Sequence, residues 1–187
     1  MKRRSKRHYP AVLVRSAHWA QPVGELHGVA AMENLHRITP TLYRGSQPMR
    51  QDLAMIRALG IRTVVSLRSF NSDARIFGLH DGIALERVRI DTWAIKDDEV
   101  FRALKAILDA ERRGPVLLHC WHGADRTGVV AAVYRMAVLG WSRDEARHEM
   151  FRGGYGYHAV WRNIPSYLAR VDIAAMRLKL GLGPLTT

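Results

Sequence analysis

The chain contains a single cysteine, and the residues around it have the clearest chemical potential in the sequence. Cys120 lies in the stretch VLLHCWHGADRTGVV, residues 116–130, between an apolar run and a loop broken by glycine. His119 precedes it, and Arg126 follows six residues later. A thiolate is a nucleophile, and a planar guanidinium pairs with two oxygens of a phosphate or sulfate at once. This spacing indicates phosphoryl transfer through a cysteinyl-phosphate.

The segment after Cys120 is suited to bind an anion between a strand and a helix. PVLLHC predicts a buried strand, and RTGVVAAVYRMAVLG predicts an apolar helix that Gly140 ends. In such a turn successive backbone N–H groups face inward around an anion, and the helix adds the positive end of its dipole. Gly123 and Gly128 are expected to let the backbone come close to a ligand.

The rest of the chain supplies alternating strands and helices to position this loop. Strands are predicted in residues 41–45, 61–69 and 84–90. Helices are predicted in residues 47–60, 97–114 and 164–180, and the capping box Ser142–Glu145 predicts the start of another helix. This alternation predicts an α/β fold with a central, mainly parallel sheet flanked by helices and connected by right-handed crossovers. Such sheets place their sites at the carboxyl ends of central strands, which is where Cys120 lies.

Length and composition favour one folded domain. The 187 residues are 48% hydrophobic, and a single cysteine excludes an intramolecular disulfide. We expect residues 1–33 to form a basic tail and a loosely organised segment, and residues 34–187 to form the domain.

Arginine and lysine give the chain a formal charge of +12, and five basic residues cluster in MKRRSKRHYP. That tail is typical of a solvated charge run, and contact with nucleic acid or an anionic membrane is the alternative. AVLV is short for a secretory h-region, and no run approaches the length of a membrane span. The expectation is a cytoplasmic protein, with export as the alternative.

The sequence HCWHGADRTG resembles the signature loop of cysteine-based protein tyrosine phosphatases: His-Cys, five residues, then Arg and a hydroxyl residue. Rhodaneses use four residues in place of five. The resemblance runs from ENLHRITPTLYRGSQP to GWSRDEARHEMFRGGYG and is strongest to bacterial dual-specificity-like tyrosine phosphatases. It implies a dual-specificity-phosphatase-like domain that hydrolyses phosphomonoesters without a metal or another cofactor.

The resemblance also assigns roles to the residues of the loop. Cys120 would be the nucleophile, and Arg126 would bind the phosphoryl group and its transition state. Thr127 would help to release the thiol by donating to it, and His119 would orient the loop and favour the thiolate. Phosphate-binding backbone N–H groups would come from Trp121, His122, Gly123, Ala124 and Asp125.

Family members take their general acid from an aspartate on a loop ahead of the cysteine. RIDTWAIKDDEV offers Asp91, Asp97 and Asp98. Asp97 and Asp98 begin a predicted helix, where acidic residues cap it and complement its dipole. Asp91 directly follows a predicted strand, so we expect Asp91 to be the acid. The sequence departs from the family pattern, because it lacks a Trp-Pro-Asp order and the acid of the nearest bacterial relatives falls nearer Trp93.

Other interpretations of this site remain. Cys120 could be an inert buried thiol, or a metal ligand with His119 and His122, although a tetrahedral site would need further ligands and no second cysteine exists. A non-catalytic phosphate-binding module is a different class of function. An enzyme could act on phosphoinositides or RNA 5′-phosphates, but the loop has no lysine and Asp125 would repel a second phosphate. A phosphotyrosine-containing protein is therefore the expected substrate.

Overall fold

A computed structural model describes residues 18–70, 73–77 and 82–183 of the chain. Its core is a six-stranded sheet with the strand order β1-β2-β3-β6-β4-β5. The strands are β1 (Gln21–Pro22), β2 (His36–Arg37), β3 (Leu42–Gly45), β4 (Thr63–Ser66), β5 (Ala84–Arg87) and β6 (Val116–His119). β3, β6, β4 and β5 are parallel to one another, and β1 and β2 are antiparallel additions at one edge. The predicted α/β fold with a mainly parallel centre is confirmed.

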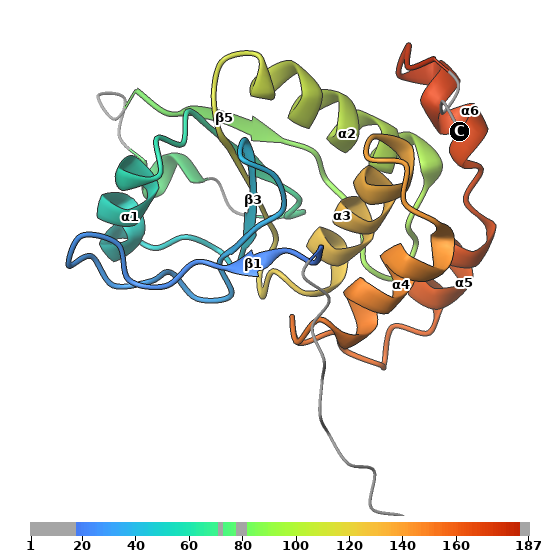
Figure 1. Ribbon diagram of the computed structural model, residues 1–187, viewed down its shortest axis with the longest axis horizontal. Coiled ribbons are helices and arrows are strands. Elements are labelled where there is room, and N and C mark those ends of the chain that lie inside the picture. The colour runs from blue at the N-terminus through green and yellow to red at the C-terminus, as the bar shows by residue number, and fades with distance from the viewer. Residues whose placement is uncertain (1–17, 71–72, 78–81, 184–187) are drawn as a thin grey trace, which may run out of the picture.

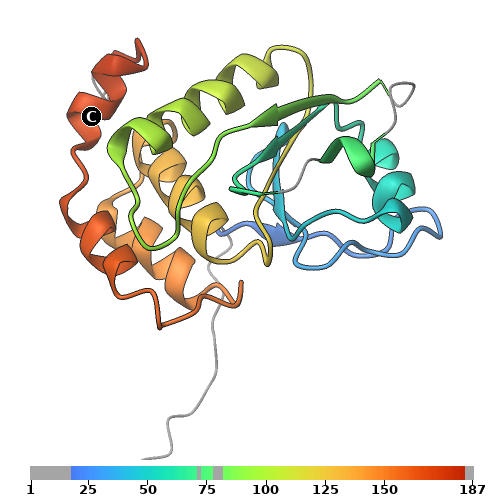
Figure 2. The same ribbon diagram turned by 180° about the vertical axis from the view of Figure 1, so that it is seen from behind.

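Helices cover both faces of this sheet (Figures 1 and 2). They are η1 (Arg50–Asp52), α1 (Leu53–Ala58), η2 (Asp73–Arg75), α2 (Asp97–Glu111), α3 (Asp125–Ala137), α4 (Arg143–Arg152), α5 (Asn163–Arg170) and α6 (Ile173–Lys179). Helices α2 to α6 gather on one side, and α1 lies on the other. No helix of the described residues has the length and apolar character needed to cross a membrane.

Successive side chains of the central strands point to opposite faces of the sheet and so contribute to two separate apolar layers. Val65 of β4 and Leu118 of β6 belong to the larger layer, beneath α2 and α3, whereas Val64 and Leu117 face the smaller layer beneath α1. Helix α3 is enclosed between the sheet and the later helices, and 12 of its 13 residues are buried. Its partly exposed residue is Arg126, so the helix that fills the core also presents one guanidinium at its first turn.

Residues 19–33 depart from the expected loose organisation. Trp19 and Ala20 are buried, and the backbone N–H of Ala20 donates to Glu149 Oε1 at 2.6 Å. Met32 is also buried, within the smaller apolar layer. The structure therefore corrects the expected start of compact packing from residue 34 to Trp19. The basic cluster MKRRSKRHYP, for which solvation or contact with anionic partners was expected, lies outside the described residues.

The single helix expected over residues 164–180 is wrong, because the structure breaks it into α5 and α6. Val171 leaves the helical conformation at φ −52° and ψ 129°. The next residue, Asp172, becomes the N-cap of α6 and accepts a hydrogen bond from the backbone N–H of Ala175 at 2.9 Å. An aspartate inside an apolar periodic pattern thus marks a new helix start.

Candidate active site

The loop that carries the cysteine lies at the carboxyl end of β6, between the ends of β3 and β4. β6 ends at His119 and α3 begins at Asp125, so residues 120–124 form the connection. Cys120 is 2% exposed and belongs to the larger apolar layer. The expected strand, loop and helix around Cys120 are therefore all present.

Three consecutive carbonyl groups of this loop are held from outside it. Their oxygens accept as follows: Trp121 from the backbone N–H of Gln47 at 2.9 Å, His122 from Asn34 Nδ2 at 2.8 Å, and Gly123 from Arg44 Nη2 at 2.8 Å. In the described part of the chain, no group accepts from the backbone N–H groups of residues 121–124. Carbonyls fixed outward leave these donors for the concave side of the loop, which is the geometry of an anion-binding nest.

Glycine is required at one position of the loop. Gly123 has φ +71°, and a Cβ atom there would lie 2.4 Å from the backbone oxygen of Gly45. The loop therefore packs directly against the end of β3. Gly128 has a different role from the one expected: it is buried in α3, and a Cβ atom there would meet the side chain of Met150 at 2.9 Å. Gly128 thus allows α3 and α4 to pack closely, and is not an approach point for a ligand.

A buried arginine supports the loop from below. Arg44 on β3 is 2% exposed, donates to Gly123, and places its Cζ 3.8 Å from the centre of the Tyr155 ring. Burial lowers the pKa of Arg44, since the charged form loses its hydration, while the neighbouring Tyr155 and Glu149 act in the opposite direction. The sequence reading missed Arg44; its one signal was a charged residue inside a short apolar strand.

His119 links the same loop to a buried carboxylate. Its Nδ1 lies 3.0 Å from the Cys120 carbonyl oxygen, and its Nε2 lies 2.9 Å from Asp73 Oδ2. Burial alone would raise the pKa of Asp73, but hydrogen bonds from His119 and Gln47 outweigh it and hold that pKa below its usual value. The ring of His119 therefore connects the backbone of the loop to the carboxylate of Asp73.

Two arginines lie side by side at the mouth of the loop. Arg126 Nη1 donates to the Leu67 carbonyl at 3.4 Å, and Arg68 Nη1 donates to Gln47 Oε1 at 2.8 Å. Arg68 also lies over the Trp121 ring, with Cζ 4.3 Å from its centre. Partial burial and the neighbouring charge of Arg126 lower the pKa of Arg68. Arg68 is a second cation that the loop motif does not contain, because it comes from the end of β4.

A pocket of about 460 Å³ opens above these arginines. Four of the large apolar side chains that the fold leaves exposed line it: Phe70, Trp93, Trp121 and Val160. They come from separate segments of the sequence, so the loop motif alone could not indicate an apolar rim. The pocket thus combines two cationic side chains with mainly aromatic walls.

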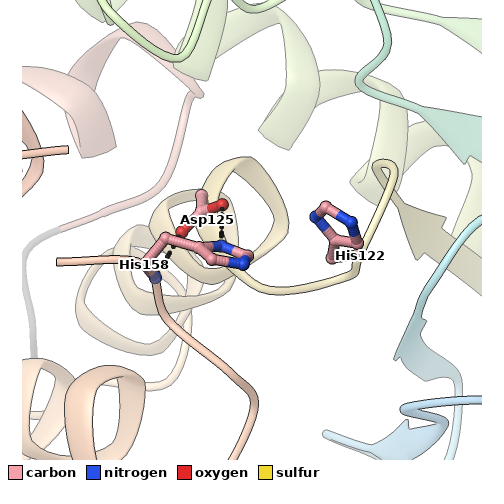
Figure 3. Close-up of side chains that lie close together, drawn as sticks. All are labelled: His122, Asp125 and His158. Atoms are coloured by element: carbon pink, nitrogen blue, oxygen red, sulfur yellow. Dashed lines mark hydrogen bonds and ion pairs between the residues drawn. The ribbon is translucent and has the colours of Figure 1, made fainter. Parts of the chain in front are cut away.

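Two further residues predicted for the site, Thr127 and Asp125, have different surroundings. Thr127 is fully buried, and its hydroxyl has no hydrogen-bond partner among the described residues. The Asp125 carboxylate is turned toward the segment after α4, where it accepts from the backbone N–H of His158 at 2.9 Å and pairs with His158 Nδ1 at 2.8 Å (Figure 3).

The three candidate general acids are separated by the fold. Asp91 accepts from Arg89 and from the hydroxyl of Ser69, which lines the pocket, and these two hydrogen bonds lower the pKa of Asp91. Asp97 and Asp98 begin α2, and Asp98 pairs with Lys179 of α6. Among the three aspartates, only Asp91 is bonded to a pocket residue and directly precedes pocket residues in the chain.

The sequence was compared with known protein families. Residues 29–154 match the model of the tyrosine phosphatase family. The chain belongs to this family. It is 37% identical to the dual specificity protein phosphatase TpbA of Pseudomonas aeruginosa (strain UCBPP-PA14), over 90% of this chain and 74% of the relative. A rice (Oryza sativa subsp. japonica) inositol diphosphatase, DSP2, is 30% identical over 54% of this chain and 53% of its own length.

Solved structures give the same result. The crystal structure of P. aeruginosa TpbA superimposes with a TM-score of 0.79 at 36% identity, covering 90% of this chain and 99% of that one. A cysteine-to-serine variant of TpbA in complex with phosphotyrosine gives a TM-score of 0.79 at 35% identity, covering 91% and 100%. The predicted family and dual-specificity-like fold are confirmed, and the chain is a phosphatase of the tyrosine and dual-specificity class.

Proposed function

We propose that the chain hydrolyses phosphotyrosine in proteins through a cysteinyl-phosphate on Cys120. The observation that carries this proposal is the pocket, in which an anion-binding loop and Arg126 lie at the foot of aromatic walls. An aryl phosphate matches both halves of that pocket, because its phosphoryl group fits the donors and its ring fits the apolar rim. The cysteine-to-serine variant of TpbA, solved with phosphotyrosine, supports the choice by analogy.

In the first step, the Cys120 thiolate attacks phosphorus, the P–O ester bond breaks and the electron pair leaves on the tyrosine oxygen. Charge on the transferring group is stabilised by the fork of Arg126 and by the N–H groups of residues 121–124, for which the described residues offer no acceptor. The buried guanidinium of Arg44 places positive charge behind the loop, which favours the thiolate, and the ring of His119 orients the loop through the Cys120 carbonyl. The chain's own groups therefore supply the charge that this step requires.

Asp91 is proposed as the group that protonates the leaving oxygen. Its hydrogen bond with Ser69 places it beside the pocket, but its pair with Arg89 favours the ionised form before substrate arrives. A bound phosphate dianion reverses this preference, because a like charge nearby disfavours ionisation of the carboxyl. Asp91 can then deliver its proton to the tyrosine oxygen.

In the second step, water attacks phosphorus and the S–P bond breaks, which regenerates the thiolate. Asp91, now ionised, takes the proton from the attacking water. The buried hydroxyl of Thr127 has no described partner, so it is free to donate to the departing sulfur. Inorganic phosphate then leaves, and Asp91 is protonated again, as it was at the start of the first step.

A substrate panel tests the proposal. Purified wild-type enzyme is given phosphotyrosine, phosphoserine and phosphothreonine peptides, a phosphoinositide and a 5′-phosphorylated RNA, with phosphate release as the readout. We expect the phosphotyrosine peptide to give the highest kcat/KM, activity to persist in EDTA, and Cys120→Ser to abolish it. A higher kcat/KM for the phosphoinositide or the RNA would contradict phosphotyrosine as the substrate. Residual turnover by Cys120→Ser would contradict the cysteinyl-phosphate intermediate.

A leaving-group comparison tests the role of Asp91. We expect Asp91→Asn to slow hydrolysis of phenyl phosphate by about 10²-fold, while a substrate with a nitrophenolate leaving group is affected far less. Asp97→Asn and Asp98→Asn serve as controls, since both residues lie at the start of α2. If either control shows this leaving-group dependence and Asp91→Asn shows none, the residue changed in that control is the general acid.

A further inference from the structure

Three side chains with metal-binding atoms meet at one edge of the pocket mouth. One ligand atom each of His122, Asp125 and His158 lies within 4.8 Å of the other two. All three residues line the pocket that contains Arg126. Figure 3 shows the His158 ring extended toward His122, with the Asp125 carboxylate beside it. The three residues come from the catalytic loop, the start of α3 and the segment after α4, which are separate in the sequence.

The fold holds the backbones of these segments together independently of any ion. Asn34 Nδ2 donates both to the His122 carbonyl at 2.8 Å and to the Tyr155 carbonyl at 3.0 Å, and so joins the loop to the segment that carries His158. The His158 backbone N–H donates to Asp125 Oδ1 at 2.9 Å. The two imidazoles are themselves neighbours, with ring centres 5.1 Å apart. The donor atoms are thus brought together by contacts that remain when a ring moves.

The chemistry of the donors fits zinc. Zn²⁺ takes imidazole nitrogen and carboxylate oxygen, and bonds of about 2.0–2.2 Å place its ligand atoms about 3.3 Å apart. His158 Nδ1 already lies 2.8 Å from Asp125 Oδ2, and His122 is exposed, so a modest rotation of its ring closes the set.

We propose that His122, Asp125 and His158 form a zinc site at the mouth of the pocket, and that occupancy by zinc inhibits the enzyme. The ion would occupy one wall of the pocket above Arg126 and leave a coordination position facing the cavity. Entry of a phosphomonoester would be obstructed while zinc is bound and restored by a chelator. The inhibition rests on the proposed function, whereas the binding site does not.

Binding is measured first, on Cys120→Ser protein, so that the cysteine sulfur cannot contribute. Competition with a chromophoric chelator should give one equivalent of bound Zn²⁺. Replacing His158 by alanine in the same background should weaken that affinity at least tenfold, and His122→Ala should do the same. His27→Asn is the matched control, because His27 is exposed, lies outside the pocket and has φ 50°, which asparagine tolerates.

Cobalt reports the ligands directly. Co²⁺ bound to Cys120→Ser should show d–d absorption that the His158→Ala change removes, with circular dichroism confirming that each variant is folded. Absence of zinc binding, or binding that neither His122→Ala nor His158→Ala weakens, would overturn the site. In otherwise wild-type protein, zinc inhibition that persists unchanged in His158→Ala would place the inhibitory ion on Cys120 and overturn the regulatory part.

Discussion

The floor and the rim of the pocket are built in opposite ways. The carbonyl oxygens of the floor, residues 121–123, are fixed by Gln47, Asn34 and Arg44, and Cys120, the proposed nucleophile, is 2% exposed. Large side chains of the rim stand in solvent, with Phe70 71% and Trp93 61% exposed. The floor holds polar groups rigidly where charge develops during the reaction, whereas the rim presents apolar surface that a substrate can cover. Under the proposed function, chemistry and substrate choice therefore belong to different parts of the pocket.

The two arginines provide the sharpest test of this division. Arg126→Lys should lower kcat by about 10³-fold, because an ammonium cannot make the bidentate contact of a guanidinium with the transferring phosphoryl group. Arg68→Lys should raise KM severalfold with a much smaller change in kcat, because Arg68 lies over Trp121 at the rim. Steady-state kinetics on a phosphotyrosine peptide measures both. A fall in kcat from Arg68→Lys as large as that from Arg126→Lys would place Arg68 in the floor.

The next largest effect is expected behind the floor, at Asp73. Asp73→Asn removes the carboxylate that holds the ring of His119, and should lower kcat/KM about tenfold, the size expected for one charge-assisted hydrogen bond. Rim variants such as Phe70→Ala should leave the rate with a small aryl phosphate almost unchanged. An unaltered kcat/KM in Asp73→Asn would show that His119 acts without its carboxylate.

Asp73 should also affect the free energy of unfolding at acidic pH. Its pKa is lower in the folded state, so its stabilising effect is complete above the unfolded pKa of about 3.9 and is lost as the pH falls through the folded value. Wild-type protein should therefore lose stability below about pH 4 more steeply than Asp73→Asn in denaturant titrations. Asp109→Asn is the control: its exposed pair with Lys105 is screened by salt, so any acid dependence it contributes should disappear at high ionic strength.

The same contrast explains what could be predicted from the sequence. The floor is one contiguous motif after an apolar strand, so Cys120 and Arg126 could be proposed from spacing, and the family comparison confirms the family that this motif indicated. Arg44 and Asp73 reach the loop only through the packing of β3 and η2, and the local sequence of Arg44 shows only a charge inside a short apolar strand, which does not reveal its partner. The rim required the three-dimensional structure, because its residues come from separate segments that only the completed fold brings together.

The smallest effect we predict concerns the pair Arg89–Asp91 at the rim. The carboxyl of Asp91 must be protonated to act as an acid, so its contribution to kcat is present below its pKa and lost as the pH rises through it. Arg89 lowers that pKa by its hydrogen bonds and charge. Arg89→Ala should therefore move the descending limb of the kcat profile of phenyl phosphate to higher pH, by less than about one unit because the pair is largely exposed.

High ionic strength and a substitution of the distant Lys105 serve as controls for this test. High ionic strength should move the wild-type limb toward that of Arg89→Ala, since screening weakens an exposed pair, and should move the limb of the variant less, because only the weaker effect of Lys96 remains to be screened. Lys105→Ala, which removes the partner of Asp109 on α2, should have no effect on the limb. A limb that stays in place in Arg89→Ala would mean that another group delivers the proton. The acid would then have to be sought among the remaining titratable residues of the rim, where His158 already pairs with Asp125.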